Sequence, residues 1–383
     1  PALQQKYKGE GQTVGLIELS DYRPQDIQAY TNCYGGSTVP ISKKSVSDGS
    51  ITGDTAAIDD GTIEAELDME LVLSTAPHLA GLNVYEGPNT TAGNFLAWDN
   101  AIAPSTSNIN RGTNDTASVI STSWSSCELD TSPELRTEEN TLFMIAAAQG
   151  QTILAASGDT GSNNGADLSE CSSYVTKGVL GVQDPASQPY VTGVGASSLQ
   201  ITSNNTYNSE TPWNWFSSGR QAATGGGLSQ MWPTPSWQQA ATYQEGYGGY
   251  DKREVPDISF NGDPDTGYWA YVYNTTDCSS SPGYTCWLGL GGTSASAPMM
   301  AGLIALANQY ALSQGYFNLG FINPALYSLA QNPGLYATDF HDLTTGDNNI
   351  DQTGGDFGAT PGYDMASGLG TPARGKLFTD LAD

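Results

Sequence analysis

The chain has 383 residues with 40 acidic and 13 basic side chains, which gives a formal net charge of −27 at pH 7. This charge argues against nucleic acid and anionic membranes as partners, because both would repel the protein. Carboxyl groups have ordinary pKa values near ~4, so the composition fits a protein that works in acid; an acidic surface that serves only solubility is the alternative. The length allows one large α/β domain, and we expect residues 1–383 to form a single domain.

Short apolar runs alternate with helical stretches along the first part of the chain. We expect strands at residues 14–19, 82–85, 117–124 and 152–156, and helices at residues 24–34, 64–74, 94–102 and 133–149. This order is typical of a mostly parallel sheet with helices on both faces. Active sites of such sheets lie beyond the carboxyl ends of the strands, where Trp124 and Asp159 are expected.

Residues 200–250 differ in composition and are rich in Asn, Ser, Gly, Trp and Tyr. We expect long surface loops here that form the walls of a substrate cleft. The aromatic run Trp213-Asn214-Trp215-Phe216 either belongs to such a wall or packs beneath a loop.

A serine in the last third of the chain has the setting of a nucleophile. The Gly-led turn before Ser294 puts this serine at the mouth of a long apolar helix, which we expect from Met299 to about Ser313. The positive helix N-terminus behind the hydroxyl favours a nucleophile. Neither histidine of the chain has a recognisable catalytic setting, but Glu64 and Asp68 share one face of a predicted helix. A serine activated by carboxylates indicates chemistry done in acid.

Five separated motifs carry a resemblance to a known family. They are the nucleophile segment 292–298, the carboxylate pair Glu64 and Asp68, the segment 156–161 around Asp159, the segment 253–259, and a C-terminal group at 342–343, 361–364 and 368–372. Together they make the chain resemble the sedolisins, serine-carboxyl peptidases that share the subtilisin fold. The resemblance covers nearly the whole chain and implies a subtilisin-like α/β fold with a C-terminal calcium-binding loop over residues 340–372.

The resemblance also implies a role for each matching residue. Ser294 would attack the scissile carbonyl, and Glu64 would accept its proton and later return it to the leaving amine. Asp68 would share a proton with Glu64, because two close carboxylates resist double ionisation. A protonated Asp159 and the backbone N–H of Ser294 would donate hydrogen bonds to the oxyanion.

Glu18 and Trp124 match positions that extend the carboxylate network in some sedolisins. The indole N–H of Trp124 could donate to Glu18; the alternative is a strand-end acid beside a packed tryptophan. The chain departs from the family pattern at Asp184 and Ala196, which puts local packing in doubt but not the chemistry.

One structural Ca²⁺ ion is implied by the C-terminal loop, because carboxylate and carbonyl oxygens in a Gly-rich loop suit this ion. The implied ligands are Asp342, Leu343, Thr360, Gly362 and Asp364. Among the five cysteines, Cys278 and Cys286 flank a loop short enough for a disulfide. Cys127 and Cys171 could form a second disulfide, which would leave Cys33 free.

The sequence thus predicts an acid-active serine-carboxyl endopeptidase that cleaves proteins and peptides. The chain begins at Pro1 without a signal peptide, so we expect a secreted, monomeric mature enzyme whose own propeptide is a partner before maturation. One alternative is a tripeptidyl-peptidase of the same family, with loops that close one end of the cleft. A second is a non-catalytic module that binds glycans or proteins through the aromatic loops of residues 200–250.

Overall fold

A computed structural model describes residues 2–34, 36–46, 56–102, 116–162, 180–239, 251–349, 357–373 and 375–383. This part of the chain forms a central eight-stranded sheet in the order β12-β8-β6-β4-β1-β3-β2, with β9 paired to β8. The first seven run parallel and β9 is antiparallel. The strands are β1 (Thr13–Glu18), β2 (Ile41–Ser45), β3 (Gly81–Glu86), β4 (Val119–Thr122), β6 (Thr152–Ala156), β8 (Thr192–Ile201), β9 (Tyr207–Pro212) and β12 (Ile258–Asn261).

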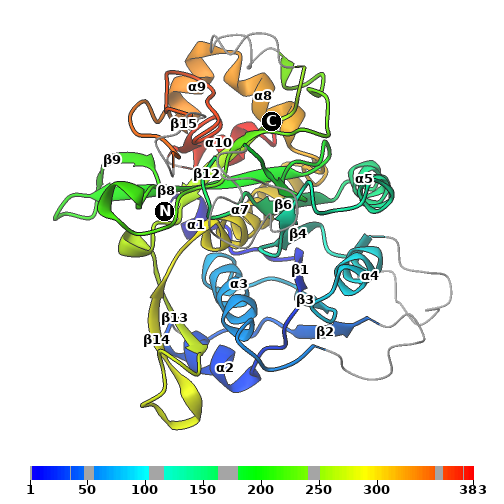
Figure 1. The fold of residues 1–383 in the computed structure, drawn as a ribbon, viewed down its shortest axis with the longest axis vertical. Coiled ribbons are helices and arrows are strands. Elements are labelled where there is room, and N and C mark those ends of the chain that lie inside the picture. The colour runs from blue at the N-terminus through cyan, green and yellow to red at the C-terminus, as the bar shows by residue number, and fades with distance from the viewer. Residues whose placement is uncertain are drawn as a thin grey trace.

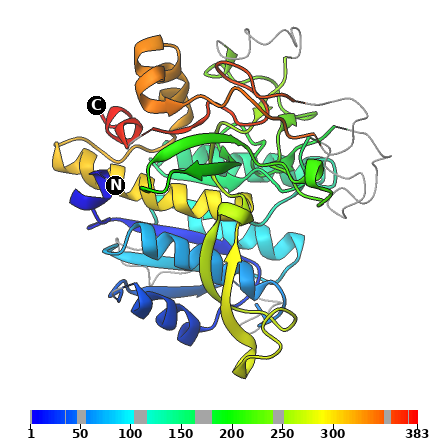
Figure 2. The same cartoon turned by 90° about the vertical axis from the view of Figure 1, so that its left-hand side faces the viewer.

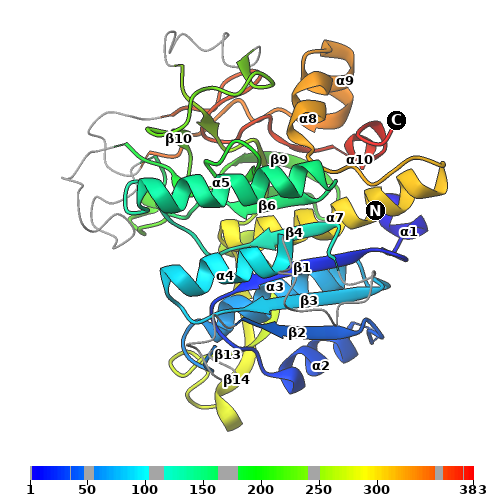
Figure 3. The same ribbon diagram turned by 90° about the vertical axis from the view of Figure 1, so that its right-hand side faces the viewer.

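Helices cover both faces of the sheet, as the alternating pattern predicts. In Figure 1, α3 and α7 lie on one side and α4 and α5 on the other, and Figure 3 shows α4 and α5 in front of the strands. The helices are α1 (Ala2–Lys6), α2 (Pro24–Cys33), α3 (Thr62–Thr75), α4 (Thr91–Ile102), α5 (Pro133–Ala148), α7 (Thr293–Ser313), α8 (Asn323–Ala330), α9 (Pro333–Asp339) and α10 (Lys376–Asp380). The described residues also form the short 3₁₀ helices η2 (Phe216–Ser218), η3 (Pro264–Thr266) and η4 (Pro282–Tyr284).

Each face of the sheet has its own apolar core, because successive strand residues point to opposite faces. Leu16 of β1 packs with Met69 and Ile304 on the side of α3 and α7. Ile17 packs with Trp98 and with residues of α5 on the other side. Strands buried on both faces are nearly continuously apolar, which is the pattern seen in the sequence.

Two-stranded ribbons accompany the central sheet in the part of the chain that the structure describes. The longest is the hairpin of β13 (Tyr268–Tyr273) and β14 (Thr285–Leu290), which runs beside α3 towards α2 (Figure 2). The others pair β5 (Ser126–Cys127) with β7 (Gln183–Asp184), β10 (Gly227–Leu228) with β11 (Glu254–Val255), and β15 (Phe340–His341) with β16 (Thr371–Pro372).

The disulfide between Cys278 and Cys286 is present, and Cys33 is free and exposed. Cys127 is disulfide-bonded, but the predicted partner Cys171 lies outside the described residues. In the described ranges, no helix is long and apolar enough to cross a membrane.

The structure corrects two of the expectations about helices and loops. The helix expected from Met299 begins six residues earlier, at Thr293, and runs through Pro298. Proline lacks the N–H that would reach Ser294 O one turn back. This carbonyl instead accepts a hydrogen bond from Ser123 Oγ at 3.2 Å, so the helix continues through the proline. Part of the region 200–250 is also strand, because β8 extends to Ile201 and pairs with β9.

Candidate active site

Polar side chains gather where the parallel strands end beneath α3 and α7. Glu18 ends β1, Ser123 and Trp124 follow β4, and Asp159 follows β6. The two covering helices add Glu64 and Asp68 from α3 and Ser294 from the first turn of α7. The carboxyl ends of these strands lie at one edge of the sheet, so residues distant in sequence come together there.

Ser123 links the two helices. Its hydroxyl lies 2.9 Å from both carboxylate oxygens of Asp68 and 3.2 Å from the carbonyl oxygen of Ser294. Asp68 is fully buried. Ser123 therefore connects the Asp68 carboxylate to the backbone of Ser294. Its hydroxyl binds the Ser294 carbonyl, which has no helical partner because Pro298 lacks an N–H.

The hydroxyls of Ser294 and Ser123 lie close enough to the Glu64 carboxyl to favour its ionised form. Burial raises the pKa of Glu64 to about 7, the Ser294 hydrogen bond opposes this rise, and the charge of Asp159 adds to it. Glu64 Oε1 is shielded from solvent and has no hydrogen-bond partner among the described residues. This carboxylate is thus poised to accept a proton from the serine at a pH where an ordinary glutamate would be a weaker base.

Two further acids, Asp68 and Glu18, belong to the same buried network as Glu64. The pKa values of Asp68 and Glu18 are both raised well above the ordinary range, first by burial; the charge of Glu18 is the next cause at Asp68. The indole N–H of Trp124 donates to Glu18 Oε2 at 2.8 Å, which partly stabilises the ionised form of Glu18. Since these carboxyls repel one another's charge, the network retains protons well above pH 4.

Asp159 is fixed by the residue that precedes Ser294. The backbone N–H and the hydroxyl of Thr293 both donate to Asp159 Oδ1, each at 2.8 Å. Burial raises the pKa of Asp159, and these two bonds oppose the rise. Because Oδ1 accepts twice, the proton of the neutral acid belongs on Oδ2. A Cβ at Gly292, which has φ +87°, would lie 2.5 Å from Oδ2, so glycine keeps that oxygen open.

Sequence reasoning missed residues that depend on strand register. Glu86 ends β3 opposite Glu18, is buried, and forms a 2.9 Å ion pair with Lys43 of β2. Its charge contributes to the raised pKa of Glu18. Ser123 was missed for the same reason. An acid at the end of each of two neighbouring strands was the available signal for Glu86.

The region expected to wall a cleft borders Asp159. Ala223 N donates to Asp159 O, and Gly161 N donates to Ala223 O, each at 2.9 Å. Within the aromatic run, Trp213 is buried, which agrees with packing beneath a loop. Trp215 is partly exposed, and Arg220 Cζ lies 3.5 Å from the centroid of its ring. Residues 240–250 lie outside the described part.

Neither histidine reaches the site. His78 pairs with Glu10 on the surface at 3.0 Å, and His341 stacks on Tyr207 with ring centroids 4.0 Å apart. Asp184, one of the departures from the family pattern, is buried and accepts from Gln188 at 2.8 Å.

Both predicted calcium carboxylates contact the same loop. Asp342 accepts from Gly362 N at 3.1 Å, and Asp364 accepts from Thr360 N at 3.0 Å. No group of three or more His, Cys, Asp or Glu side chains suited to a metal ion occurs in the described part of the chain. The predicted set contains only two such side chains, and its other donors are backbone carbonyls. Two carboxylates and several carbonyls at one loop are hard oxygen donors of the kind that suit Ca²⁺.

Comparison with known proteins identifies the family. Residues 78–318 match the family model described as "Peptidase_S8: Subtilase family". The solved structure of Pseudomonas sedolisin, a serine-carboxyl proteinase complexed with pseudo-iodotyrostatin, superposes with a TM-score of 0.77 at 30% identity, over 97% of this chain and 92% of that one. The chain belongs to the sedolisin family. The fold is therefore the subtilisin-like α/β fold that the motifs predict.

Curated relatives extend this likeness to whole sequences. Kumamolisin from Bacillus sp. (strain MN-32) is 34% identical over 376 residues, which cover 97% of this chain and 60% of kumamolisin. Tripeptidyl-peptidase 1 from Canis lupus familiaris is 31% identical over 337 residues, which cover 83% of this chain and 52% of that protein. The chain thus spans about half to three-fifths of the length of these relatives.

Proposed function

We propose that the protein is an acid-active serine-carboxyl endopeptidase that hydrolyses peptide bonds of proteins and peptides through an acyl-enzyme on Ser294. The observation that carries this proposal is the arrangement in which Ser123 bonds both the buried Asp68 and the backbone of Ser294, beside Glu64, whose pKa burial raises to about 7. Membership of the sedolisin family supports the same chemistry. In this proposal residues 1–383 are one catalytic domain.

The first half of the reaction forms the acyl-enzyme. Ser294 Oγ attacks the scissile carbonyl carbon while its proton passes to Glu64, and the carbonyl electron pair moves onto oxygen. Asp159, protonated on Oδ2, and the Ser294 N–H donate hydrogen bonds to this oxyanion. When the tetrahedral intermediate collapses, the C–N bond breaks and Glu64 gives its proton to the leaving amine. Water then repeats these steps at the ester and releases the acid.

The pH dependence follows from the number of protons on the Glu64–Asp68 pair. The productive form of the pair holds one proton, which Glu64 and Asp68 share. Glu64 can then accept a second proton from Ser294. Burial and mutual repulsion raise the pKa values of both carboxyls, so the last proton of the pair leaves well above the pH at which an ordinary carboxyl ionises. Ionisation of Asp159 would also replace an oxyanion donor by a repelling charge. Activity should therefore fall on the alkaline side through both routes.

The test is hydrolysis of a denatured protein from pH 2 to 8 by the wild type and by Ser294→Ala. We expect a maximum at about pH 3–5 and a loss of activity in the variant at every pH. Activity that still rises above pH 7 would refute the carboxylate mechanism. Full activity of Ser294→Ala would refute the nucleophile.

A tripeptidyl-peptidase is the second candidate, favoured by the similarity to tripeptidyl-peptidase 1. The loop around Trp215 and Arg220 would then close one end of the cleft. The masses of the products from a long peptide distinguish the two candidates. Internal fragments support an endopeptidase, whereas a ladder of successive tripeptides from the N-terminus supports the alternative.

One structural Ca²⁺ ion completes the proposal, held by the carboxylates of Asp342 and Asp364 and the backbone carbonyls of Leu343, Thr360 and Gly362. The ion would tie the C-terminal loop to the core and takes no part in the reaction. A chelator should lower the melting temperature, and added Ca²⁺ but not Mg²⁺ should restore it, because a site rich in carbonyls suits the larger ion. An unchanged melting temperature in chelator would refute the site.

The remaining proposals concern the protein in its surroundings. It is secreted into an acidic environment, acts as a monomer, and binds its own propeptide before maturation. The acid-rich composition supports the first of these. Sedimentation of the protein at pH 4, with and without the separately expressed propeptide, tests the other two.

A further inference from the structure

Helix α3 carries two sets of carboxylates. Glu64 and Asp68 belong to the proposed active site, whereas Glu66 and Glu70 alternate with them along the helix. Both Glu66 and Glu70 are buried. The proposed reaction does not use these two acids. Because burying an acid costs free energy, their burial calls for another explanation.

Both of these side chains bind the backbone of β13. Tyr273 N donates to Glu66 Oε2 at 2.6 Å, and Tyr271 N donates to Glu70 Oε2 at 2.9 Å. The two donors are two residues apart on a strand, and the two acceptors are one helical turn apart. Two strand residues advance ~6.6 Å and four helix residues ~6.0 Å, so the spacings match. One edge of β13 pairs with β14. On the opposite edge, the two carboxyls of α3 accept the N–H hydrogen bonds that a neighbouring strand would otherwise accept.

The hairpin leads directly to the nucleophile. β13 is paired with β14 over its whole length, and β14 ends at Leu290, four residues before Ser294. Helix α3 therefore carries the proposed base, Glu64, and also binds the hairpin that leads to Ser294. A shift of the hairpin against α3 would move Ser294 relative to Glu64.

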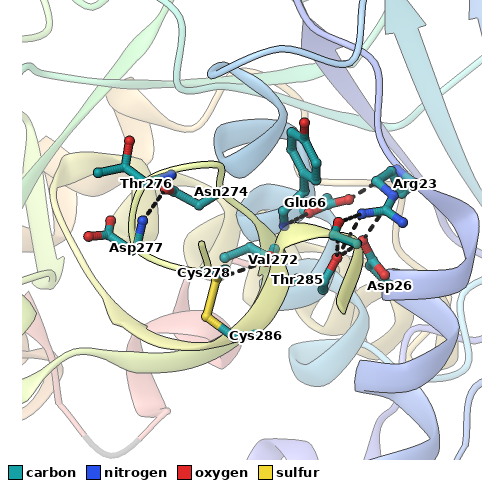
Figure 4. Close-up of a disulfide and its surroundings, with 12 residues drawn as sticks. Arg23, Asp26, Glu66, Val272, Asn274, Thr276, Asp277, Cys278, Thr285 and Cys286 are labelled. Carbon is teal, nitrogen blue, oxygen red and sulfur yellow. Dashed lines mark hydrogen bonds and ion pairs between the residues drawn. A yellow bond between two sulfur atoms is a disulfide. The ribbon is translucent and has the colours of Figure 1, made fainter. Parts of the chain in front are cut away.

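Further contacts fix the far half of the hairpin (Figure 4). Glu66 Oε1 accepts from Arg23 N at 3.0 Å, and the Arg23 guanidinium donates to Gly283 O at 2.7 Å. Thr285 Oγ1 donates to Asp26 Oδ2 at 3.1 Å, and the Cys278–Cys286 disulfide closes the loop between the strands. The carboxyl cluster of Asp26, Glu66 and Glu70 thus lies between α2, α3 and the hairpin.

We propose that Glu66 and Glu70 are positioning residues that hold the hairpin, and hence Ser294, in place as neutral carboxyls, and that the hairpin is released when they ionise. The part of this proposal that concerns Ser294 rests on the proposed function.

The charges around the cluster explain why ionisation would release the hairpin. From α2 and the residue before it, Arg23, Asp26 and the Tyr30 phenol face the cluster, and α3 adds Glu66 and Glu70. The hairpin contributes tyrosine rings and backbone. In the described ranges, Arg23 is the cation in contact, so three ionised acids would face one guanidinium. Glu70 Oε1 has no hydrogen-bond partner in these ranges, which makes its ionised form still more costly.

The direction of the pH effect follows from linkage. Burial raises the pKa of Glu66 to about 8 and that of Glu70 to about 10, from an ordinary value of 4.5. The folded hairpin therefore binds these protons more tightly than the released one does. Its stability is complete below pH ~4.5 and declines as the pH rises towards the two folded values.

The test replaces both acids by an amide, which cannot ionise and keeps one acceptor oxygen for the N–H group of β13; at position 66 the acceptor for Arg23 N is lost. Amide hydrogen exchange of Tyr271 and Tyr273, corrected for the intrinsic rate at each pH, is measured at pH 4 and pH 7.5 in the wild type and in Glu66→Gln/Glu70→Gln. The amide of Leu16 in the central sheet is the internal reference, and Glu138→Gln, exposed on α5, is the matched control.

We expect wild-type protection of the two amides to fall at least about tenfold relative to Leu16 at pH 7.5, and protection in the double variant to change by less than about threefold. The Glu138→Gln control should behave as the wild type. Unchanged wild-type protection at pH 7.5, or an equal loss in the double variant, would overturn the proposal. If the double variant does not fold, Glu70→Gln alone should retain the protection of Tyr271 only.

Activity provides a second readout. The fall of kcat between pH 4 and pH 7.5 should be at least about tenfold larger in the wild type than in the Gln variant, whereas kcat at pH 4 should agree within about threefold. Since hydrogen exchange needs no substrate, a protein that shows the exchange pattern but no hydrolysis would refute the proposed function and leave the hairpin assignment intact. Equal losses of activity in both proteins would refute the link to Ser294.

Discussion

Glu128 gives a measurable pH dependence of stability that is separate from the active site and from the hairpin. Its buried carboxylate accepts from Ser229 Oγ at 2.8 Å and from Gln230 N. Burial raises the pKa of Glu128 to about 7, and these two bonds oppose the rise. The perturbation is Glu128→Gln, which preserves the shape and removes the titration.

The magnitude follows from the two protonation equilibria. The unfolded chain has the ordinary value of 4.5 and the folded chain about 7, so the folded state binds this proton more tightly. The associated stability is present below pH ~4.5, declines up to about pH 7 and is constant above it. At ~1.36 kcal/mol per pH unit, the loss is about 3 kcal/mol. The free energy of unfolding of the wild type relative to Glu128→Gln should fall by this amount between pH 4 and pH 8.

Urea unfolding at pH 4 and pH 8 measures this difference directly. The control is Glu138→Gln, because Glu138 is exposed on α5 and its difference from the wild type should be the same at both pH values. A wild-type-minus-variant difference that changes by less than about 1 kcal/mol would refute the reasoning, since it would mean that Glu128 is equally solvated in the folded and unfolded chains.

Two further predictions concern the active site. Gly292→Ala should lower kcat at least about a hundredfold, because its Cβ would lie 2.5 Å from Asp159 Oδ2; Gly315→Ala, at a similar φ of +86° but with open space, should leave kcat unchanged and thereby isolates the contact from backbone strain. Lys43→Met should shift the alkaline limb of the kcat/KM profile to lower pH by roughly half a unit, because an unpaired Glu86 would take up a proton and cease to repel the other carboxyls, while Lys43→Arg should keep the wild-type profile. A uniform loss of rate in Lys43→Met, without a shifted limb, would assign Lys43 a purely structural role.

The sequence was informative where chemistry depends on local spacing. Glu64 and Asp68 are one helical turn apart, and the glycines before Ser294 form a turn with a positive φ, so both features are legible from neighbouring residues. The alternation of strands and helices likewise predicted the sheet and its two covered faces.

Contacts that depend on strand register could not be predicted from the sequence. Ser123 meets Asp68 only because β4 ends beneath α3, and Glu86 meets Glu18 only because β3 pairs with β1 in that register. The start of α7 was misplaced because Pro298 is ordinarily a helix boundary. The hydroxyl that replaces its missing hydrogen bond comes from a residue about 170 positions away in the chain.

The hairpin of β13 and β14 projects from the body of the molecule, where an open strand edge could recruit other chains. The N–H groups of Tyr271 and Tyr273 on the second edge of β13 are already bound by side chains of α3. An edge whose donors are occupied offers no template for intermolecular sheet formation. In a protein that loses much of its surface charge in acid, and with it the repulsion between molecules, we expect the same two carboxyls that hold the strand to protect against aggregation as well.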